Sequence, residues 1–331
     1  MANYNPTIFG CAGLELSAGE KDFFREAAPW GFILFARNIS SPDQIRALTA
    51  DLRATTGRNT PILIDQEGGR VARLQAPNWL QWLPPLEQMN RVAPQHATRS
   101  MWIRYRLIAD ELRALGIDAN CAPMLDIPTS QVHAIIRNRC YGESVEVVVE
   151  AGHAVAGGLL AGGGLPVLKH IPGHGRPNAD SHAERPRTDA SKSVLTQTDF
   201  APFRALNHLP LGMSAHVVYS SIDPVNCATQ SKPMIEVIRS EIGFDGALMT
   251  DDLSMSALEG TLAVRTRRAL DAGCDVILHC NGNIAEMAEV TSATHAPSAK
   301  TTKRLERALS FRAPPEPMER DQLLAELSKL L

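Results

Sequence analysis

Eight short apolar stretches alternate along the chain with longer segments of helical periodicity, and this alternation restricts the fold more than any other feature. The stretches that we predict as strands are 7–11, 31–36, 61–65, 118–126, 166–170, 211–216, 247–251 and 275–280. Several are apolar throughout, which is typical of parallel strands covered on both faces. Eight such strands joined by helices predict a closed parallel barrel.

The segments between these stretches carry helix signals. Ser41 and Pro42 supply a capping hydroxyl and a first-turn proline ahead of apolar residues at helical spacing. Further helices are predicted at about 98–115, 145–161, 196–207, 233–242, 261–272, 284–290, 303–311 and 317–331. We therefore predict an α/β fold, a single-domain (β/α)8 TIM-like barrel over residues 1–331, with C-terminal helices from about 300.

The composition excludes several classes of protein. A net charge of -3 gives no broad basic surface for nucleic acid, and no window has the roughly 18 apolar residues of a membrane span. Six cysteines without C-x-x-C spacing favour reduced, partly buried thiols over zinc ligands. The first residues lack the pattern of a secretory signal, so we expect a cytoplasmic protein with no nucleic-acid or membrane partner.

Polar residues gather where the predicted strands end. Asp65, Asp126, His216 and Asp251 each close an apolar run, and Lys169 begins a segment rich in histidine, proline and glycine that extends to residue 182. In a barrel of this class the strand ends converge on one face, and burying several charges without a use is costly. The sequence therefore predicts an active site there, and the long connections 127–144 and 171–192 are interpreted as functional loops.

Several motifs occur together in one order along the chain. They include Asp65-Gln66-Glu67-Gly68-Gly69-Arg70-Val71, Lys169-His170, Gly173-His174-Gly175, Asp180-Ser181-His182 and Thr250-Asp251-Asp252-Leu253-Ser254-Met255. From about Phe9 to Asn281 the chain resembles the β-N-acetylhexosaminidase branch of glycoside hydrolase family 3. The resemblance implies a retaining glycosidase on a (β/α)8-like barrel that acts on a small GlcNAc-containing carbohydrate and needs no cofactor or metal ion.

The resemblance also implies residue roles. Asp251 matches the family's nucleophile, His182 its general acid/base and Asp180 the partner of that histidine. The implied activity is removal of terminal GlcNAc from peptidoglycan fragments such as GlcNAc-1,6-anhydro-MurNAc peptides, through a covalent glycosyl-aspartate. The positions that match the family's substrate contacts are Asp65, Arg73, Arg139, Lys169 and His170.

Chemistry alone leaves more open. Asp251 and Asp252 point to opposite sides of an extended chain, and we favour Asp251 as the one that faces substrate. An imidazole near a carboxylate suits proton transfer, but an isolated Asp-x-His triplet is ordinarily a solvated surface feature. Arg70 and Arg73 would also fit a structural salt-bridge network, and His174, between glycines, is interpreted as shaping its loop.

Three segments depart from the family pattern. Arg137-Asn138-Arg139 stands where Gly-Asp-Arg is common, so Asn138 lacks the charge that would hold a neighbouring arginine. Gly175-Arg176-Pro177 and Glu184-Arg185-Pro186 also differ from the usual catalytic loop. The preference for the leaving group can differ while the chemistry is retained.

Other interpretations fit some of the same residues. A glycoside phosphorylase, or a hydrolase of another β-linked sugar, is compatible with a neutral His182, which would repel phosphate less than a carboxylate does. An inactive sugar-binding barrel would need neither Asp251 nor His182. A metal hydrolase would use His170, His174 and His182, whose spacing is irregular for a metal site.

We also expect His182 to reach the sugar only when its loop closes.

Overall fold

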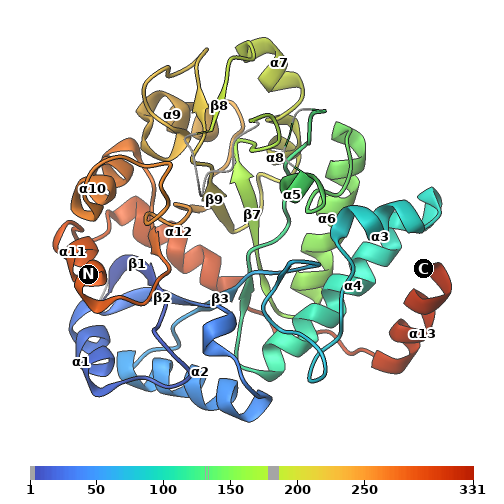
Figure 1. The fold of residues 1–331 in the computed structure, drawn as a ribbon, viewed down its shortest axis with the longest axis horizontal. Helices are drawn as coiled ribbons and strands as arrows, with labels where there is room; N and C mark the ends of the chain where they lie inside the picture. Colours follow the sequence, from blue (N-terminus) through green and yellow to red (C-terminus); the bar gives the residue numbers. More distant parts are fainter. Residues whose placement is uncertain (1–3, 131, 133, 178–185) are drawn as a thin grey trace.

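The protein is a parallel barrel surrounded by helices (Figure 1). The computed structural model describes residues 4–130, 132, 134–177 and 186–331. Within these ranges, eight strands build the barrel, and each overlaps one of the predicted stretches. They are β1 (Asn5–Phe9), β2 (Pro29–Leu34), β3 (Ile62–Ile64), β6 (Ala119–Asn120), β7 (Leu165–Ile171), β9 (Leu211–Ser214), β11 (Ala247–Met249) and β12 (Ile277–His279).

The strand order closes the sheet on itself. Neighbouring strands follow the order β11-β9-β7-β6-β3-β2-β1-β12, and the paired neighbours are parallel. Met249 of β11 forms a parallel bridge with Val276, and the Asp275 N–H donates to the Leu248 carbonyl at 2.7 Å. These contacts join the last strand to β11, so the predicted α/β barrel is confirmed.

Two small sheets lie outside the barrel order. An antiparallel hairpin pairs β4 (Gln66–Gly68) with β5 (Val71–Ala72), directly after β3. A parallel pair joins β8 (Arg187–Thr188) to β10 (Val218–Tyr219). Neither was predicted from sequence, because each pair is only two or three residues long.

Helices connect the strands along the outside of the barrel. Most were predicted: α2 (Pro42–Thr56), α4 (Pro94–Ala114), α6 (Val145–Ala161), α9 (Lys232–Ser240), α10 (Leu262–Ala272), α11 (Ile284–Ser292), α12 (Ala299–Ser310) and α13 (Arg320–Leu330). Others were not: α1 (Ala18–Ala27), α3 (Pro85–Arg91) and α5 (Ala134–Arg137), with two single 3-10 turns at Ala36–Asn38 and Ala228–Gln230.

Two proline residues explain where the predicted bounds differ from the structure. The expected helix 196–207 is two helices, α7 (Lys192–Gln197) and α8 (Ala201–Ala205), since Pro202 has no N–H to continue the hydrogen bonding and instead begins α8. The fourth strand, expected over 118–126, pairs regularly only at Ala119–Asn120. Pro123 interrupts it, and Met124 then forms an isolated bridge with Lys169.

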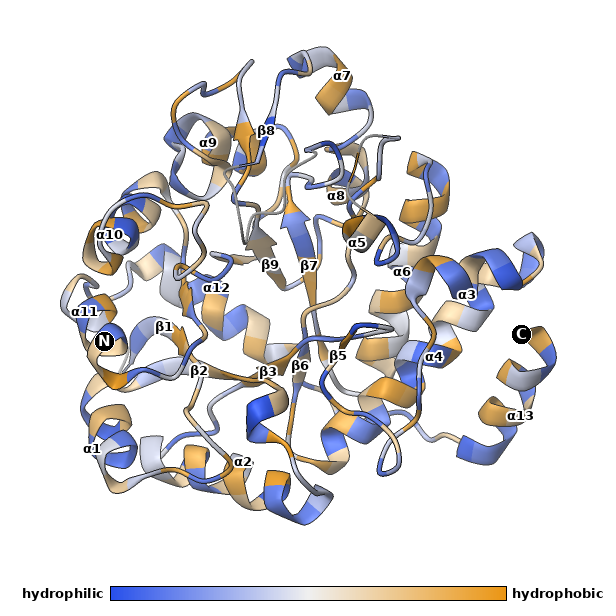
Figure 2. Ribbon diagram, in the orientation of Figure 1, coloured by the Kyte–Doolittle hydropathy of each residue, from blue (hydrophilic) through white to orange (hydrophobic). Residues whose placement is uncertain are grey.

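The barrel strands β1, β2 and β3 are coloured largely as hydrophobic in Figure 2. The apolar side chains of the barrel strands divide between two buried clusters. Ile8, Ile33 and Val167 belong to a cluster that fills the barrel interior. Their chain neighbours, such as Phe9 and Leu168, belong to the larger cluster between strands and helices. Alternate side chains of a strand point to opposite faces, so burial on both faces requires the continuous apolar runs seen in the sequence.

Helix α12 closes the amino-terminal end of the barrel. Leu305 and Ala308 pack with the interior cluster, which includes residues at the starts of several strands. Arg304 forms ion pairs with Asp245 at 2.7 Å and with Asp275 at 3.2 Å. All six cysteines lie in the described chain as buried thiols, as predicted. Across the described ranges, no helix combines the length and apolar character needed to cross a bilayer.

Candidate active site

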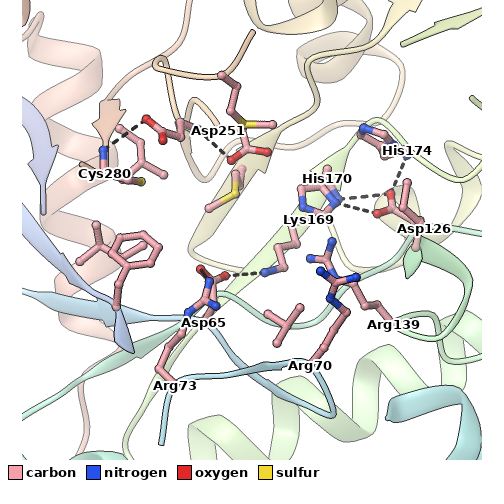
Figure 3. A pocket seen from close by; sticks show the side chains of 18 residues that line it. Asp65, Arg70, Arg73, Asp126, Arg139, Lys169, His170, His174, Asp251 and Cys280 are labelled. Carbon is pink, nitrogen blue, oxygen red and sulfur yellow. Dashed lines mark hydrogen bonds and ion pairs between the residues drawn. The ribbon is translucent and has the colours of Figure 1, made fainter. Parts of the chain in front are cut away.

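A cavity of about 460 Å³ opens where the barrel strands end (Figure 3). It lies at the carboxyl ends because parallel strands in a barrel bring those ends together on one face. Residues that are distant in sequence therefore become neighbours. The predicted site residues that line the cavity are Asp65, Arg73, Arg139, Lys169, His170 and Asp251.

A network of ion pairs lies at one side of the cavity. Lys169 Nζ is 2.7 Å from Asp65 Oδ1 and 2.7 Å from Glu67 Oε1, and the lysine side chain is only 1% exposed. Arg139 makes two hydrogen bonds to Glu67, of 2.9 and 2.7 Å. Arg73 Nη2 lies 3.3 Å from Asp65 Oδ2. Two carboxylates thus fix three cations, an arrangement that offers both donors and acceptors to a polar ligand.

The ion pairs keep these groups charged despite their burial. Burial opposes ionisation of Asp65, but Lys169 and then Arg73 outweigh it and hold the pKa of Asp65 well below its usual range. Burial also opposes the charge of Glu67, yet Arg139 and Lys169 lower the pKa of Glu67 to about 2. Conversely, Asp65 and Glu67 raise the pKa of Lys169 against the effect of its own burial. The network is therefore fully ionised at neutral pH.

The β4–β5 hairpin carries Glu67 into this network. Gln66 holds the two arms together: its Nε2 donates to the Leu74 carbonyl at 2.9 Å, and its Oε1 accepts from the N–H groups of Arg73 and Leu74 at 2.8 and 3.0 Å. Glu67 is 1% exposed and was not among the predicted site residues. The sequence showed a second carboxylate two positions after Asp65, but the neighbouring residues did not indicate that a hairpin would bury it in the site.

Arg139 reaches the cavity from the long connection after β6, just beyond α5. Asn138 has no charge and cannot form an ion pair with Arg139, as the sequence indicated. Glu67 supplies the carboxylate instead. Arg137 turns away and pairs with Glu143. The unusual Arg-Asn-Arg segment therefore leaves Arg139 with a strong partner from another part of the chain.

Asp126 fixes the beginning of the histidine-rich segment. Its Oδ2 lies 2.7 Å from His170 Nδ1, and its Oδ1 accepts from the His174 N–H at 2.6 Å. Burial opposes ionisation of Asp126, but the His170 imidazole outweighs it and lowers the pKa of Asp126. An ionised Asp126 therefore holds the His170 ring through Nδ1 and the following loop through the His174 backbone N–H.

The His174 ring also lines the cavity. Burial lowers the pKa of His174 to about 4, so the ring is neutral at physiological pH. Its Nδ1 has no hydrogen-bond partner among the described residues, while its backbone N–H is held by Asp126. His174 therefore fixes its loop through the backbone and presents an imidazole to the same space.

Asp251 stands opposite this network at the end of β11 (Figure 3). Its Oδ1 accepts from the Asp252 N–H at 2.8 Å, and no cation of the described chain forms an ion pair with it. Burial would raise the pKa of Asp251, but the His216 and His170 imidazoles outweigh this effect and lower it. Asp251 is thus an ionised carboxylate that faces the cavity without a direct counter-ion in the described structure.

Neighbouring groups hold the Asp251 loop in place. His216, at the end of β9, lies 2.8 Å from Thr229 Oγ1 through Nδ1 and 3.1 Å from the Asp252 carbonyl through Nε2. The Asp252 carboxylate accepts from the N–H groups of Ser254 and Cys280, at 3.1 and 3.2 Å. These contacts fix the backbone directly after Asp251, and the Thr250 N–H, which donates to the Val276 carbonyl at 3.0 Å, fixes it directly before. The Asp251 carboxylate therefore has a defined direction.

The predicted acid/base pair lies outside the described residues, since Asp180 and His182 fall within 178–185. The described chain is anchored just before this segment. A Cβ on Gly175 would lie 1.8 Å from the Ile127 carbonyl oxygen, and Arg176 Nε lies 2.7 Å from Asp199 Oδ2. Within the described parts, no group of three histidine, cysteine or acidic residues is arranged to hold a metal ion.

Comparison with known sequences decides the family. Residues 20–311 match the profile described as the glycosyl hydrolase family 3 N terminal domain. The chain belongs to glycoside hydrolase family 3. The predicted family is confirmed, and so is the prediction that the protein is a glycoside hydrolase.

Family 3 relatives match along most of the chain. A beta-hexosaminidase of Alkalilimnicola ehrlichii is 39% identical over 289 residues, which cover 83% of this chain and 80% of the relative. One of Nitrosospira multiformis is 35% identical over 292 residues, 85% of this chain and 82% of the relative. Among solved structures, NagZ of Neisseria gonorrhoeae in complex with N-trifluoroacetyl-D-glucosamine is 30% identical. The structural match covers 99% of this chain and 98% of the NagZ chain, with a TM-score of 0.87.

Proposed function

We propose that this family 3 protein is an exo-β-N-acetylglucosaminidase that removes terminal GlcNAc from peptidoglycan fragments such as GlcNAc-1,6-anhydro-MurNAc peptides. Its relatives are named beta-hexosaminidases, and the Neisseria gonorrhoeae NagZ structure holds an N-acylated glucosamine. The observation that carries the proposal is the ionised Asp251 facing a cavity that is lined on the other side by fixed donors and acceptors. A nucleophile and a sugar-binding surface then share one space.

The proposed sugar contacts follow from unused hydrogen-bonding capacity. The Lys169 ammonium has three N–H donors, and two are taken by Asp65 and Glu67, so one is available to a hydroxyl. The Asp65 oxygens can each accept a further hydrogen bond. The His170 ring, held by Asp126, lies at the cavity wall, and Arg73 and Arg139 present guanidinium donors there. Donors and acceptors at fixed positions suit the hydroxyl and amide groups of GlcNAc.

The proposed reaction has two steps. Asp251 forms a bond to the anomeric carbon while the glycosidic C–O bond breaks, and the leaving oxygen takes a proton from His182. Water then attacks the anomeric carbon, gives its proton to His182 and releases Asp251. Asp180 would orient the His182 ring and stabilise its protonated form. Two displacements at the same carbon retain the β configuration.

We propose further that the whole chain acts as one catalytic domain in the cytoplasm. One hydrophobic cluster joins residues from Phe9 to Leu327, so the C-terminal helices share the core of the barrel. Six buried thiols are compatible with a reducing compartment, where disulfides are rare. Cell fractionation with an antibody against the protein would test the location; recovery in the secreted fraction would contradict it.

The decisive experiment is to trap the covalent intermediate. A 5-fluoro-GlcNAc derivative with a good leaving group should inactivate the enzyme and add one sugar mass to the peptide that contains Asp251. Asp251→Ala should lack both the label and turnover of an aryl β-GlcNAc. Label on another carboxylate, or equal turnover by Asp251→Ala, would refute the proposed nucleophile.

The same assays separate the competing functions. Product analysis with and without inorganic phosphate distinguishes the two reactions, since a phosphorylase forms GlcNAc-1-phosphate whereas a hydrolase forms GlcNAc in both conditions. A sugar-binding barrel without activity would bind GlcNAc but leave every aryl glycoside intact. We expect free GlcNAc with the β configuration as the first product.

A further inference from the structure

Among the residues that the structure describes, Arg70 differs from the other cations of the cavity in having no counter-ion. Lys169 pairs with Asp65 and Glu67, Arg139 pairs with Glu67, and Arg73 pairs with Asp65. Arg70 lines the same cavity, yet among the residues that the structure describes it forms neither an ion pair nor a hydrogen bond. A guanidinium is charged at any physiological pH, so no described residue competes with an external anion for this cation.

The position of Arg70 is at the open side of the cavity. Arg70 is exposed, whereas the Lys169 side chain is 1% exposed and Asp65 is mostly buried. An exo-acting enzyme binds the terminal sugar in the enclosed part of its cavity, so the rest of the substrate leaves through the mouth. A side chain at the mouth therefore meets the leaving group rather than the terminal sugar. Figure 3 shows Arg70 extending into the cavity from the β4–β5 turn.

The backbone that carries Arg70 is held firmly. The Gly69 N–H donates to the Trp82 carbonyl at 3.0 Å, and the buried Arg104 donates to the Leu83 carbonyl at 2.8 Å. The turn is thus tied to the segment beside it before any ligand binds. A fixed backbone reduces the conformational entropy that binding would otherwise cost.

We propose that Arg70 forms a subsite for a carboxylate on the leaving group of the substrate. This inference rests on the proposed glycosidase function and adds to it a preference for anionic aglycones. A planar guanidinium can bind a carboxylate through two parallel hydrogen bonds, which a neutral aglycone does not offer. The enzyme therefore selects substrates by charge beyond the sugar that it releases.

The test compares two glycosides that differ only in charge, the para-carboxyphenyl and para-carbamoylphenyl β-glycosides of GlcNAc. The measured quantity is the ratio of their kcat/KM values, since general damage to the enzyme and the intrinsic reactivity of each phenol cancel between enzyme variants. Arg70→Gln should lower the anionic-to-neutral ratio by about tenfold, as expected for loss of a hydrogen bond to a charged group. Arg70→Lys should keep most of the preference, because it keeps the charge.

A matched control and the effect of salt complete the test. The control variant is Arg113→Gln. Arg113 is exposed near the end of α4 and lies outside the cavity, so this variant should keep the wild-type ratio. In the wild type the ratio should fall as salt is added, because ions screen an exposed charge pair. This salt series needs no variant, so a ratio that does not fall with salt overturns the subsite even if Arg70→Gln does not fold.

The outcomes distinguish the two proposals. If the wild type hydrolyses both glycosides but the ratio is the same in Arg70→Gln and insensitive to salt, the carboxylate subsite is refuted and the glycosidase function stands. If the wild type hydrolyses neither glycoside, the proposed function fails and the subsite fails with it. A ratio that drops in Arg70→Gln, and recovers in Arg70→Lys, supports the subsite.

Discussion

The buried carboxylate of Glu67 offers the sharpest test of how this site is stabilised. Glu67→Gln keeps the size of the side chain but removes the charge between Lys169 and Arg139. Lys169 would retain only Asp65, and Arg139 would lose its counter-ion among the described residues. We therefore expect a large loss of stability, because buried cations would be left without full compensation.

The pKa of Glu67 gives the magnitude. The folded protein lowers it from an ordinary 4.5 to about 2, a difference that corresponds to about 3 kcal/mol of unfolding free energy at neutral pH. Removing one partner of a buried ion pair typically costs about 3–5 kcal/mol, which agrees. For a chain of 331 residues, about 3 kcal/mol lowers Tm by about 4–5 °C.

The pH dependence follows from the sign of the shift. A carboxyl whose pKa is lowered by folding contributes its full stability above its unfolded value of about 4.5, and that contribution disappears as the pH falls toward 2. The difference in unfolding free energy between wild type and Glu67→Gln should therefore be constant from neutral pH down to about 5.5 and shrink below about 4.5.

Thermal and urea unfolding, followed by circular dichroism, measure this difference. Glu236→Gln, on an exposed position of α9, is the matched control and should change the unfolding free energy by less than about 0.5 kcal/mol. If Glu67→Gln is no less stable than Glu236→Gln, or if its deficit does not depend on pH below 4.5, the ion-pair reasoning is wrong.

Further predictions concern the same site. Asp65→Asn leaves Lys169 and Arg73 without this carboxylate, and we expect kcat/KM on an aryl β-GlcNAc to fall by about 100-fold or more while the fold is kept; an unchanged value would remove Asp65 from substrate binding. Gly68→Ala places a Cβ 1.8 Å from a terminal nitrogen of Arg104 at a φ of 110°, so Tm should fall by several degrees; a Tm equal to the wild type would contradict this. Activity should survive dialysis against a strong chelator, and loss restored by added zinc would instead support a metal enzyme.

The barrel was predictable because its strands must be apolar on both faces. Ile33 fills the interior and its neighbour Leu34 packs under the helices, so both had to be hydrophobic and the run was visible in one dimension. Helix α1 was missed although its capping box is in the sequence: Ser17 and Glu20 hydrogen-bond to each other's backbone N–H groups. Its apolar face is too short to give a clear helical periodicity in the sequence.

The site was predictable where a charge ends a strand and less so where it depends on a distant partner. Asp65, Lys169 and Asp251 follow apolar runs, so their positions on one face came from the fold itself. Glu67 became important only because the hairpin folds back and meets Arg139, which lies 72 positions away in the chain. Long-range pairing of this kind leaves little local trace. The roles of the individual residues stay predictions.

The short hairpin after β3 has a consequence for engineering. Residues 65–73 carry Asp65, Glu67, Arg70 and Arg73, while Asp251 comes from a strand on the other side of the cavity. The backbone of the hairpin is held by its own Gln66 and by the neighbouring loop, whereas its carboxylates depend on Lys169 and Arg139 from distant parts of the chain. If Arg70 selects the leaving group as proposed, exchanging this segment between barrels, together with its partners Lys169 and Arg139, would change that selectivity while Asp251, the proposed nucleophile, stays in place.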